Sequence, residues 1–186
     1  MKILTIILPA LLLLGISPTL PAQELKPVKQ YIYEVKTGDN KSYDLIITVY
    51  QEQPDLIFSW KTSEENVRHG KFTISENARK TSGMMLYSFE NGDMELKDKT
   101  AMWVSEKVFN DLKKGSVTLD LGDGVETYSL TGKEQLETLV SGKKEKIKVL
   151  HGSNGKGTEI WIIDDGKNPL LFKMNRGGSI FLKEII

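Results

Sequence analysis

The side chains that could carry out catalysis are few in this sequence. Its 186 residues include two histidines, His69 and His151, and no cysteine. Nucleophilic catalysis needs a hydroxyl or thiol held next to a base, and neither histidine lies in a nucleophile elbow or in the spacing of a zinc site. Both histidines fall at the ends of predicted strands. We therefore interpret them as solvent-exposed residues rather than as catalytic groups or metal ligands.

Paired carboxylates are the other route to acid–base chemistry. Asp164 and Asp165 are adjacent, and Asp120 lies shortly before Asp123. Neighbouring residues of a strand point to opposite faces, so adjacency alone does not bring two carboxylates together. The oxygen-rich stretch 164–168 lacks the ligand spacing of a helix–loop–helix calcium site. We predict no catalytic residue, no metal and no cofactor, with a carboxylate-dependent hydrolase built on Asp164 or Asp165 as a remote alternative.

The charge balance limits the kinds of partner that the chain would attract. The sequence has 25 basic and 25 acidic residues, and 39% of its residues are hydrophobic. This composition is typical of a soluble globular protein. Long-range electrostatics would not draw a chain without net charge to nucleic acid or to anionic lipid, so we expect no nucleic-acid partner.

The first residues have the pattern of an export signal. Lys2 supplies a positive start, residues 3–14 are mostly apolar, and the small Ala22 precedes the expected cleavage point. The apolar run is short for a membrane span and is broken by a proline, which favours a removed signal peptide at residues 1–22 over an uncleaved anchor. We expect residues 23–186 to be exported without a stable membrane span. The absence of cysteine favours the bacterial envelope, in the periplasm or outside the cell.

Short runs of alternating apolar and polar residues dominate the rest of the chain. Such alternation is the pattern of a half-buried β-strand, and it recurs between turns rich in Gly, Asn and Asp. Short connections favour antiparallel neighbours, because a parallel pair needs a long crossover. We predict one mainly β domain over residues 23–186, a single antiparallel curved sheet or partly closed barrel of about ten or eleven strands. The runs centre on residues 45–50, 56–61, 72–74, 84–86, 94–96, 117–121, 147–149, 160–162, 170–174 and 180–182.

One short helix is predicted over residues 106–114. Ser105 can cap its first turn, an apolar stripe follows, and Gly115 can end it. The segment 131–141 has two interpretations, because its start resembles a capping box although the same residues also suit a strand that turns into 143–150. We favour the strand.

Aromatic and methionine side chains form the most distinctive feature of the predicted strands. On a curved sheet they could line a concave apolar surface that suits an acyl chain or a similar guest. The alternative is that they only fill the core. The predicted ligand-binding residues are Trp60, Trp103, Trp161, Met84 and Phe172.

Three predicted strand segments are apolar on both faces. They are residues 45–50, 160–163 and 170–172. An isolated sheet would expose one of those faces to water, so we expect a second layer, the helix at 106–114, a partner or a ligand to cover them.

The C-terminal third resembles a known group of exported domains. Lys146-Ile-Lys-Val-Leu150 is followed by a hairpin, by Glu159-Ile-Trp-Ile-Ile-Asp-Asp165 and by Asn168-Pro-Leu-Leu-Phe-Lys-Met174. A tryptophan-bearing strand, an acidic turn, a proline-leucine step and a final strand pair make this part similar to the β-rich domains of the domain of unknown function 3108 type. The resemblance implies an envelope location and a curved antiparallel sheet, and it assigns no functional residue.

These observations lead to two main functional hypotheses. The first is an exported, non-enzymatic β-domain that binds a hydrophobic small molecule in a concave apolar interior. The alternative is a protein-interaction or structural module that covers its spare apolar face with another envelope protein. The carboxylate-dependent hydrolase remains the third and most remote hypothesis.

Overall fold

The computed structural model describes residues 26–186. The predicted signal peptide, residues 1–22, lies outside the described residues, as does the expected cleavage point after it. Two short helices, α1 (Glu76–Thr81) and α2 (Glu106–Lys114), interrupt a series of strands. The strands are β1 (Lys29–Lys36), β2 (Ser42–Gln51), β3 (Leu56–Thr62), β4 (His69–Ile74), β5 (Met85–Leu86), β6 (Met94–Leu96), β7 (Thr100–Ala101), β8 (Ser116–Asp120), β9 (Val125–Val140), β10 (Lys143–Ser153), β11 (Glu159–Ile163), β12 (Leu171–Asn175) and β13 (Ser179–Ile185).

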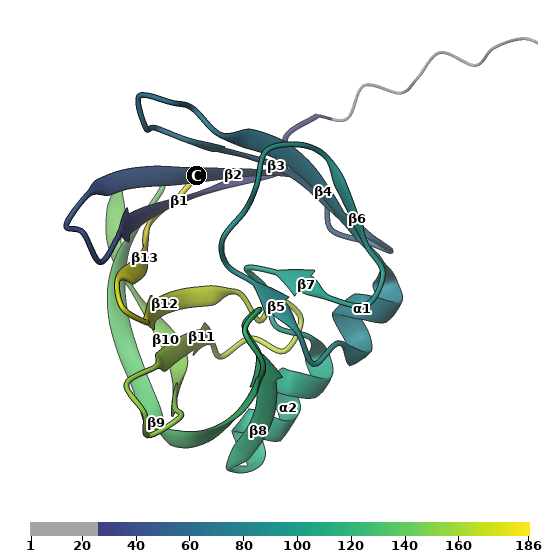
Figure 1. The fold of residues 1–186 in the computed structure, drawn as a ribbon, viewed down its shortest axis with the longest axis vertical. Helices are drawn as coiled ribbons and strands as arrows, with labels where there is room; N and C mark the ends of the chain where they lie inside the picture. Colours follow the sequence, from purple (N-terminus) through teal and green to yellow (C-terminus); the bar gives the residue numbers. More distant parts are fainter. Residues whose placement is uncertain (1–25) are drawn as a thin grey trace, which may run out of the picture.

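Eleven of these strands form one curved sheet. Their order is β6-β4-β3-β2-β1-β13-β12-β11-β10-β9-β8, and the pairing of β1 with β13 joins the two runs of antiparallel neighbours. In Figure 1 the sheet has a C-shaped cross-section, with β2 and β3 along the top and β8 at the bottom. The predicted fold class, a mainly β protein built on a curved antiparallel sheet, is confirmed.

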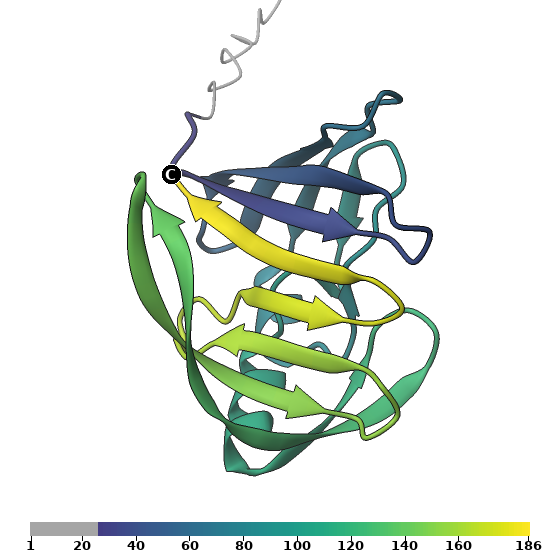
Figure 2. The ribbon, with the colours of Figure 1, turned by 90° about the vertical axis from the view of Figure 1, so that its left-hand side faces the viewer.

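Strand β9 turns the lower half of the sheet into a partial ring. Its first residues pair with β8, its longer remainder pairs with β10, and its last residues run parallel to β13, with Leu139 opposite Glu184 and Val140 opposite Ile185. Figure 2 shows β9 and β10 reaching up along the side of the sheet towards the end of β13. The sequence analysis favoured a strand over a helix for the segment 131–141. Residues 131–140 belong to β9, so the strand is confirmed.

Three parallel pairings depart from the predicted meander. They are β9 with β13, β4 with β6, and β5 with β7 in a separate two-stranded sheet. The β4–β6 pairing is possible because the chain between these strands carries α1 and β5 and so provides the crossover that parallel neighbours need.

The structure has two helices in its described part, where the sequence predicted one. Helix α2 has the predicted bounds: the Ser105 side chain accepts a hydrogen bond from the backbone of Val108, and Gly115 ends the helix with a φ of 137°. Helix α1 was missed because it has six residues and buries only Ala78, so it lacks the apolar stripe that reveals a helix.

The concave side of the sheet is filled by the chain's own side chains. Every second residue of β1 to β4 points inward, and Tyr33, Ile47, Phe58 and Phe72 are fully buried. The segment 85–104, which carries β5, β6 and β7, crosses the open side of the C and adds buried side chains such as those of Met85, Met102 and Trp103 to the same core.

A second, smaller apolar layer lies on the convex side, where β9 wraps against β10 to β13. Phe181 points outward because its neighbours Ile180 and Leu182 point inward, and its ring meets Phe172 edge-on at 5.6 Å between centroids. The hydroxyl of Thr138 on β9 donates to the backbone oxygen of Leu182 at 2.8 Å. This layer covers the segments 160–163 and 170–172, whereas Ile46 and Tyr50 of the segment 45–50 lie on an outer face without such a cover.

Candidate functional site

The candidate site is a cleft at one edge of the curved sheet. It has a volume of about 220 Å³ and lies between the β1–β2 turn, the β12–β13 turn and residues 87–88, which follow β5. Figure 2 shows the two turns at the same edge of the molecule. Three segments that are distant in the sequence therefore meet at this cleft.

The cleft has an apolar floor and aromatic walls. Val35, Met174 and Ile180 form the floor, and each is at least 90% buried. Tyr43 on β2 and Tyr87 after β5 form the walls and are half-buried. Contact with an apolar guest would be favourable here, because the guest would remove the exposed parts of the aromatic rings from water.

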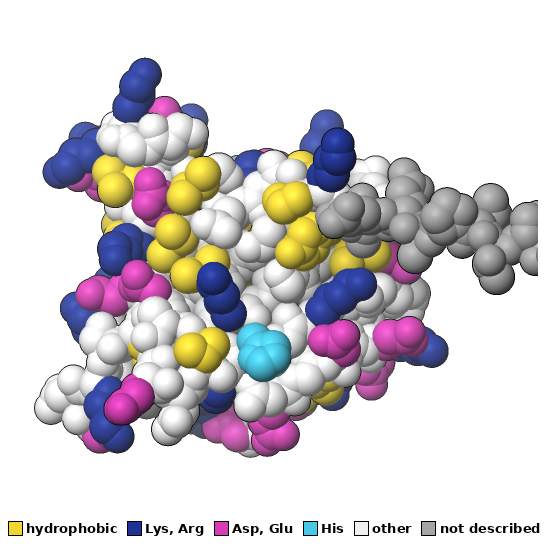
Figure 3. Space-filling model, turned by 90° about the horizontal axis from the view of Figure 1, so that it is seen from above, with side chains coloured by type: hydrophobic (Ala, Val, Ile, Leu, Met, Phe, Trp, Pro, Cys, Tyr) yellow, Lys and Arg dark blue, Asp and Glu magenta, His cyan; other side chains and the backbone are white. Residues whose placement is uncertain are grey.

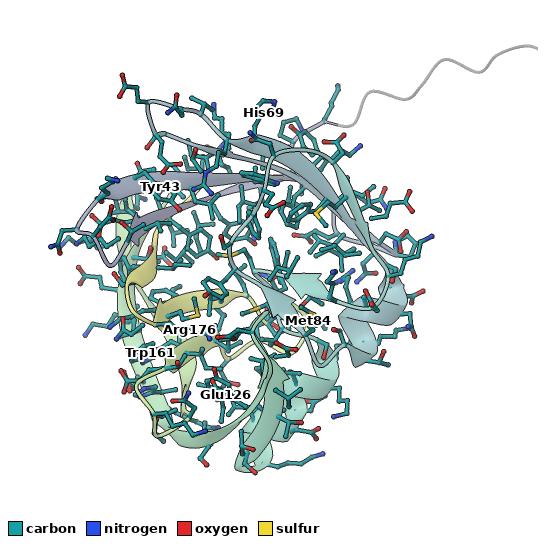
Figure 4. All side chains as sticks on the ribbon, in the orientation of Figure 1. Tyr43, His69, Met84, Glu126, Trp161 and Arg176 are labelled. Carbon is teal, nitrogen blue, oxygen red and sulfur yellow. The ribbon has the colours of Figure 1, made fainter. Side chains whose placement is uncertain are left out.

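Arg176 places a positive charge at the wall of the cleft. Its Nη1 donates to the Tyr87 hydroxyl at 3.3 Å, its guanidinium carbon lies 5.7 Å from the centre of the Tyr87 ring, and its Nη2 pairs with the carboxylate of Asp123. The Arg176 side chain is 18% exposed, whereas that of Asp123 is 61% exposed. The guanidinium thus contacts a partly buried ring and is balanced by a carboxylate at the surface. Figure 4 shows Arg176 on the concave side of the sheet.

The walls of the cleft are supported from behind. Arg68 donates to the Tyr43 hydroxyl at 3.1 Å and to the backbone oxygen of Phe89 at 3.2 Å, while its Nε pairs with Glu64 at 3.0 Å. A small void of about 10 Å³ behind the cleft touches Trp60 and shares Tyr43 and other wall residues with it. These contacts fix the orientation of the Tyr43 ring.

Glycines allow the two turns at the cleft rim to approach each other. A Cβ atom on Gly178 would lie 2.4 Å from the backbone oxygen of Lys36, and one on Gly38 would lie 2.6 Å from the backbone oxygen of Gly177. No larger residue fits at these points without moving a backbone segment. The shape of the cleft therefore depends on the absence of side chains at its rim.

A second polar group lies on the concave face beside β8. The carboxylate of Glu126 accepts hydrogen bonds from the Tyr128 hydroxyl at 3.3 Å and from Asn154 Nδ2 at 2.9 Å. Burial, together with the charge of Glu126, raises the pKa of the Tyr128 hydroxyl, because both disfavour the phenolate. The carboxylate of Glu126 thus accepts hydrogen bonds from two neutral groups.

Two of the predicted ligand-binding residues lie in the concave core. Trp60 and Trp103 are 2% and 6% exposed and belong to one aromatic cluster, in which Phe58 contacts Trp103 at 5.3 Å and Phe72 contacts Trp60 at 6.1 Å between ring centroids. Their rings pack against other rings, and Trp60 touches the small void behind the cleft and a groove on the outer face of β1 to β4. Trp60 Nε1 has no hydrogen-bond partner among the described residues.

The other three predicted residues lie elsewhere. Trp161 and Phe172 belong to the convex side and are 5% and 0% exposed. Met84 is half-buried and forms an isolated bridge with Asp120 at the edge of β8. The structure therefore brings together Trp60 and Trp103, but it does not join all five residues in one cavity.

His151 lies in a closed cluster on the convex side. Its ring stacks on Trp161 at 4.2 Å between centroids, its Nδ1 is 2.7 Å from Glu134, and its Nε2 is 3.5 Å from Glu159. The opposite face of Trp161 is covered by Lys173, whose Nζ lies 4.3 Å from the ring centre. The interpretation of His151 as a solvent-exposed residue was wrong, because its side chain is only 15% exposed. His69 is exposed, as predicted.

The paired carboxylates point to separate partners. Asp164 is 16% exposed and forms ion pairs with Lys113 at 2.9 Å and Lys133 at 3.9 Å. Asp165 accepts a hydrogen bond from the backbone of Lys167 within its own turn. Asp120 likewise stabilises the β8–β9 turn through the backbone of Gly122 and Gly124, whereas Asp123 pairs with Arg176.

Other kinds of site are not found in the described part of the chain. Within residues 26–186, no group of three or more histidine, aspartate or glutamate side chains is arranged to hold a metal ion. Neither α1 nor α2 has the length and apolar character that crossing a bilayer requires.

A groove of about 440 Å³ crosses the outer face of β1 to β4 and is lined by apolar, polar and charged residues together. Figure 3 shows this mixed face from above.

Comparisons with protein-family models, curated proteins and solved structures find no match to this chain. The resemblance of the C-terminal third to exported β-rich domains stays a prediction.

Sequence reasoning missed the residues that form the cleft. Tyr43, Tyr87 and Arg176 come from three separate segments, and no local pattern connects them. One feature of the sequence could have pointed to Arg176: it is one of three arginines among the 25 basic residues, and it precedes a Gly-Gly turn. Arginine is favoured over lysine where a charge must be partly buried, so its choice at a turn marks a position worth testing.

Proposed function

We propose that this chain is a non-enzymatic binding domain that accepts a small hydrophobic molecule in the cleft between Tyr43 and Tyr87, and that it acts in the bacterial envelope. The observation that carries the proposal is a preformed cleft of about 220 Å³ with a buried apolar floor. Ligand pockets usually measure about 300–1,000 Å³. A small guest, or the end of a longer one, fits a cleft of this size.

The location of the cleft distinguishes this proposal from binding in the central interior. The concave core is occupied by aromatic side chains of β1 to β4 and by the segment 85–104, so a guest there would have to displace packed residues. At the cleft, a guest would cover Tyr43 and Tyr87 without rearranging the core. The ligand site therefore lies at the edge of the sheet rather than among the tryptophans.

The proposal of a non-enzymatic role rests on how the reactive groups are engaged. His151 is stacked on Trp161, Asp164 is paired with two lysines, and Asp165 accepts a hydrogen bond within its turn. None of these groups lines the cleft, so a guest bound there would meet a guanidinium and tyrosine hydroxyls but no acid–base pair.

Titration with 1-octanol, followed by NMR and calorimetry, tests the proposal. The resonances of cleft residues such as Met174 should shift in a saturable manner. Ser88→Trp places a large ring at the exposed rim of the cleft and should abolish binding. Ser129→Trp, at an exposed position of β9, is the matched control and should leave binding unchanged. Absence of saturable binding, or binding that survives Ser88→Trp, would contradict the proposed site.

A measurement on protein purified from its native host addresses the ligand directly. Native mass spectrometry should detect a small apolar adduct, which organic extraction should release. The same measurement on the Ser88→Trp variant is the control, because a blocked cleft should yield no adduct.

A further inference from the structure

We propose that the ligand of the cleft carries a carboxylate that binds Arg176, and that Asp123 is the internal counter-ion that this carboxylate displaces. The inference rests on the proposed function, since it names the chemical class of the molecule that the cleft accepts. Arg176 supplies the positive charge, and the apolar floor receives the rest of the molecule.

The charged side chains that line the cleft are all positive. Arg176 and Lys36 line it, and no acidic side chain of residues 26–186 does so. Lys36 already pairs with Glu34 at 3.0 Å, and its side chain is 56% exposed. Arg176 is therefore the cation that a guest in the cleft would meet at short range, and its charge favours an anion over a neutral or cationic guest.

Arg176 and Asp123 differ in how firmly they are held. The guanidinium also has a hydrogen bond to the Tyr87 hydroxyl and lies beside that ring, and neither contact involves Asp123. Asp123 is 61% exposed and lies in a turn that is held by Asp120, so its carboxylate can return to water while the turn remains intact. An ion pair with one exposed partner contributes little stability and is readily exchanged.

A carboxylate suits this position for geometric reasons. The guanidinium fork matches a planar carboxylate with two parallel hydrogen bonds, which a lysine could not provide. In the folded protein the exposed carboxylate of Asp123 pairs with one nitrogen of this fork, Nη2. A ligand carboxylate would make the same contact from the cleft side while its apolar part covers Met174 and Ile180. Burial of that apolar part gives the ligand an advantage that Asp123 lacks.

Three eight-carbon probes separate this inference from the proposed function: octanoate, 1-octanol and octylammonium at pH 7. Octanoate should bind about 10-fold or more tightly than 1-octanol, because a charge-assisted pair forms with Arg176, and octylammonium should bind more weakly than both. If 1-octanol binds but octanoate binds no better, the carboxylate assignment is wrong and the proposed function stands. If none of the probes binds, both fail.

Two variants test the proposed roles of Arg176 and Asp123. Arg176→Met keeps an apolar stem and should remove the preference for octanoate over 1-octanol. Asp123→Asn removes the competing charge and should tighten octanoate binding about 3- to 5-fold while 1-octanol binding stays the same. Lys173→Met, which removes a cation from the convex side, is the matched control and should change neither affinity. Unchanged octanoate affinity in Asp123→Asn would overturn the displacement by Asp123, whatever the stability of the Arg176 variant.

Discussion

Two cation–aromatic pairs lie on opposite faces of the same sheet and have opposite surroundings. On the concave side, Arg176 lies beside Tyr87 at the edge of a cleft of about 220 Å³. On the convex side, Lys173 covers one face of Trp161, and His151 covers the other at 4.2 Å. Trp161 is 5% exposed, whereas Tyr87 is half-buried.

The difference shows what turns an aromatic group and a charge into a binding site. In the Trp161 cluster, both faces of the ring are covered by the protein, and Glu134 accepts a hydrogen bond from the indole nitrogen at 3.2 Å. That cluster leaves no face of the indole ring open to a guest. At the cleft, one side of Tyr87 remains open and the charge has a replaceable partner, so the same residue types can contribute binding energy.

The largest expected effect is the loss of the Trp161 side chain. Trp161→Ala should lower the free energy of unfolding by about 3–5 kcal/mol, because it removes a buried ring and leaves a cavity. Tyr87→Ala should cost about 1–2 kcal/mol, since the ring is only half-buried. Urea denaturation monitored by circular dichroism measures both. Equal losses for the two variants would break the comparison between the closed cluster and the open cleft.

A closed environment should also keep the Tyr31 hydroxyl neutral at high pH. Tyr31 is 1% exposed and packs edge-on against Trp103 at 5.7 Å, and burial raises its pKa to about 12. Because the folded state holds this proton more tightly than the unfolded state, the stabilisation is complete below pH 10 and is lost as the pH rises to 12. The loss attributable to Tyr31 is about 3 kcal/mol.

The measurement is the free energy of unfolding between pH 9 and pH 12, for the parent and for Tyr31→Phe. Burial also raises the pKa of Tyr33, so the parent and the variant should both lose stability in this range, and the parent should lose more. Identical slopes would show that Tyr31 ionises in the folded protein as it does in the unfolded chain.

Adding a side chain at the rim of the cleft should reduce both stability and binding, although the cleft is open on one side. Gly178→Ala puts a Cβ atom 2.4 Å from the backbone oxygen of Lys36 and should cost about 1–3 kcal/mol through overpacking. It should also weaken 1-octanol binding, because the two turns at the rim must separate. Gly83→Ala is the control, since a Cβ atom there meets nothing within 4 Å. Parent-like stability and binding in Gly178→Ala would show that the rim is adaptable.

Much of the fold could be predicted because it depends on local patterns. Period-two alternation located most strands, and Ser105 with Gly115 located helix α2, since a cap, a stripe and a stop lie within a few residues of one another. The contact of β9 with β13 could not be predicted in this way. It joins Leu139 to Glu184 across distant sequence, and alternation carries no information about which strand becomes the neighbour.

The candidate site was less predictable than the fold. Trp60 and Trp103 were selected because large aromatic rings line many ligand sites, yet rings of this size also fill a core, and here they do so. Tyr87 follows the two-residue strand β5 and precedes the exposed Ser88. Nothing in its local sequence shows that it will meet Arg176, so only the tertiary structure reveals the cleft.

The smallest expected effect concerns the cation over Trp161. Lys173→Met keeps the apolar stem over the ring but removes the ammonium group, and it should cost about 0.5–1 kcal/mol, the range of a partly exposed cation–π contact. Arg176→Met at the cleft should reduce stability to a similar extent, because its ion pair with Asp123 is exposed on one side. The two variants should therefore differ in octanoate binding and agree in urea denaturation. If Lys173→Met lost several kcal/mol, the ammonium group would be an essential part of the closed cluster, and charge as well as packing would distinguish the two faces.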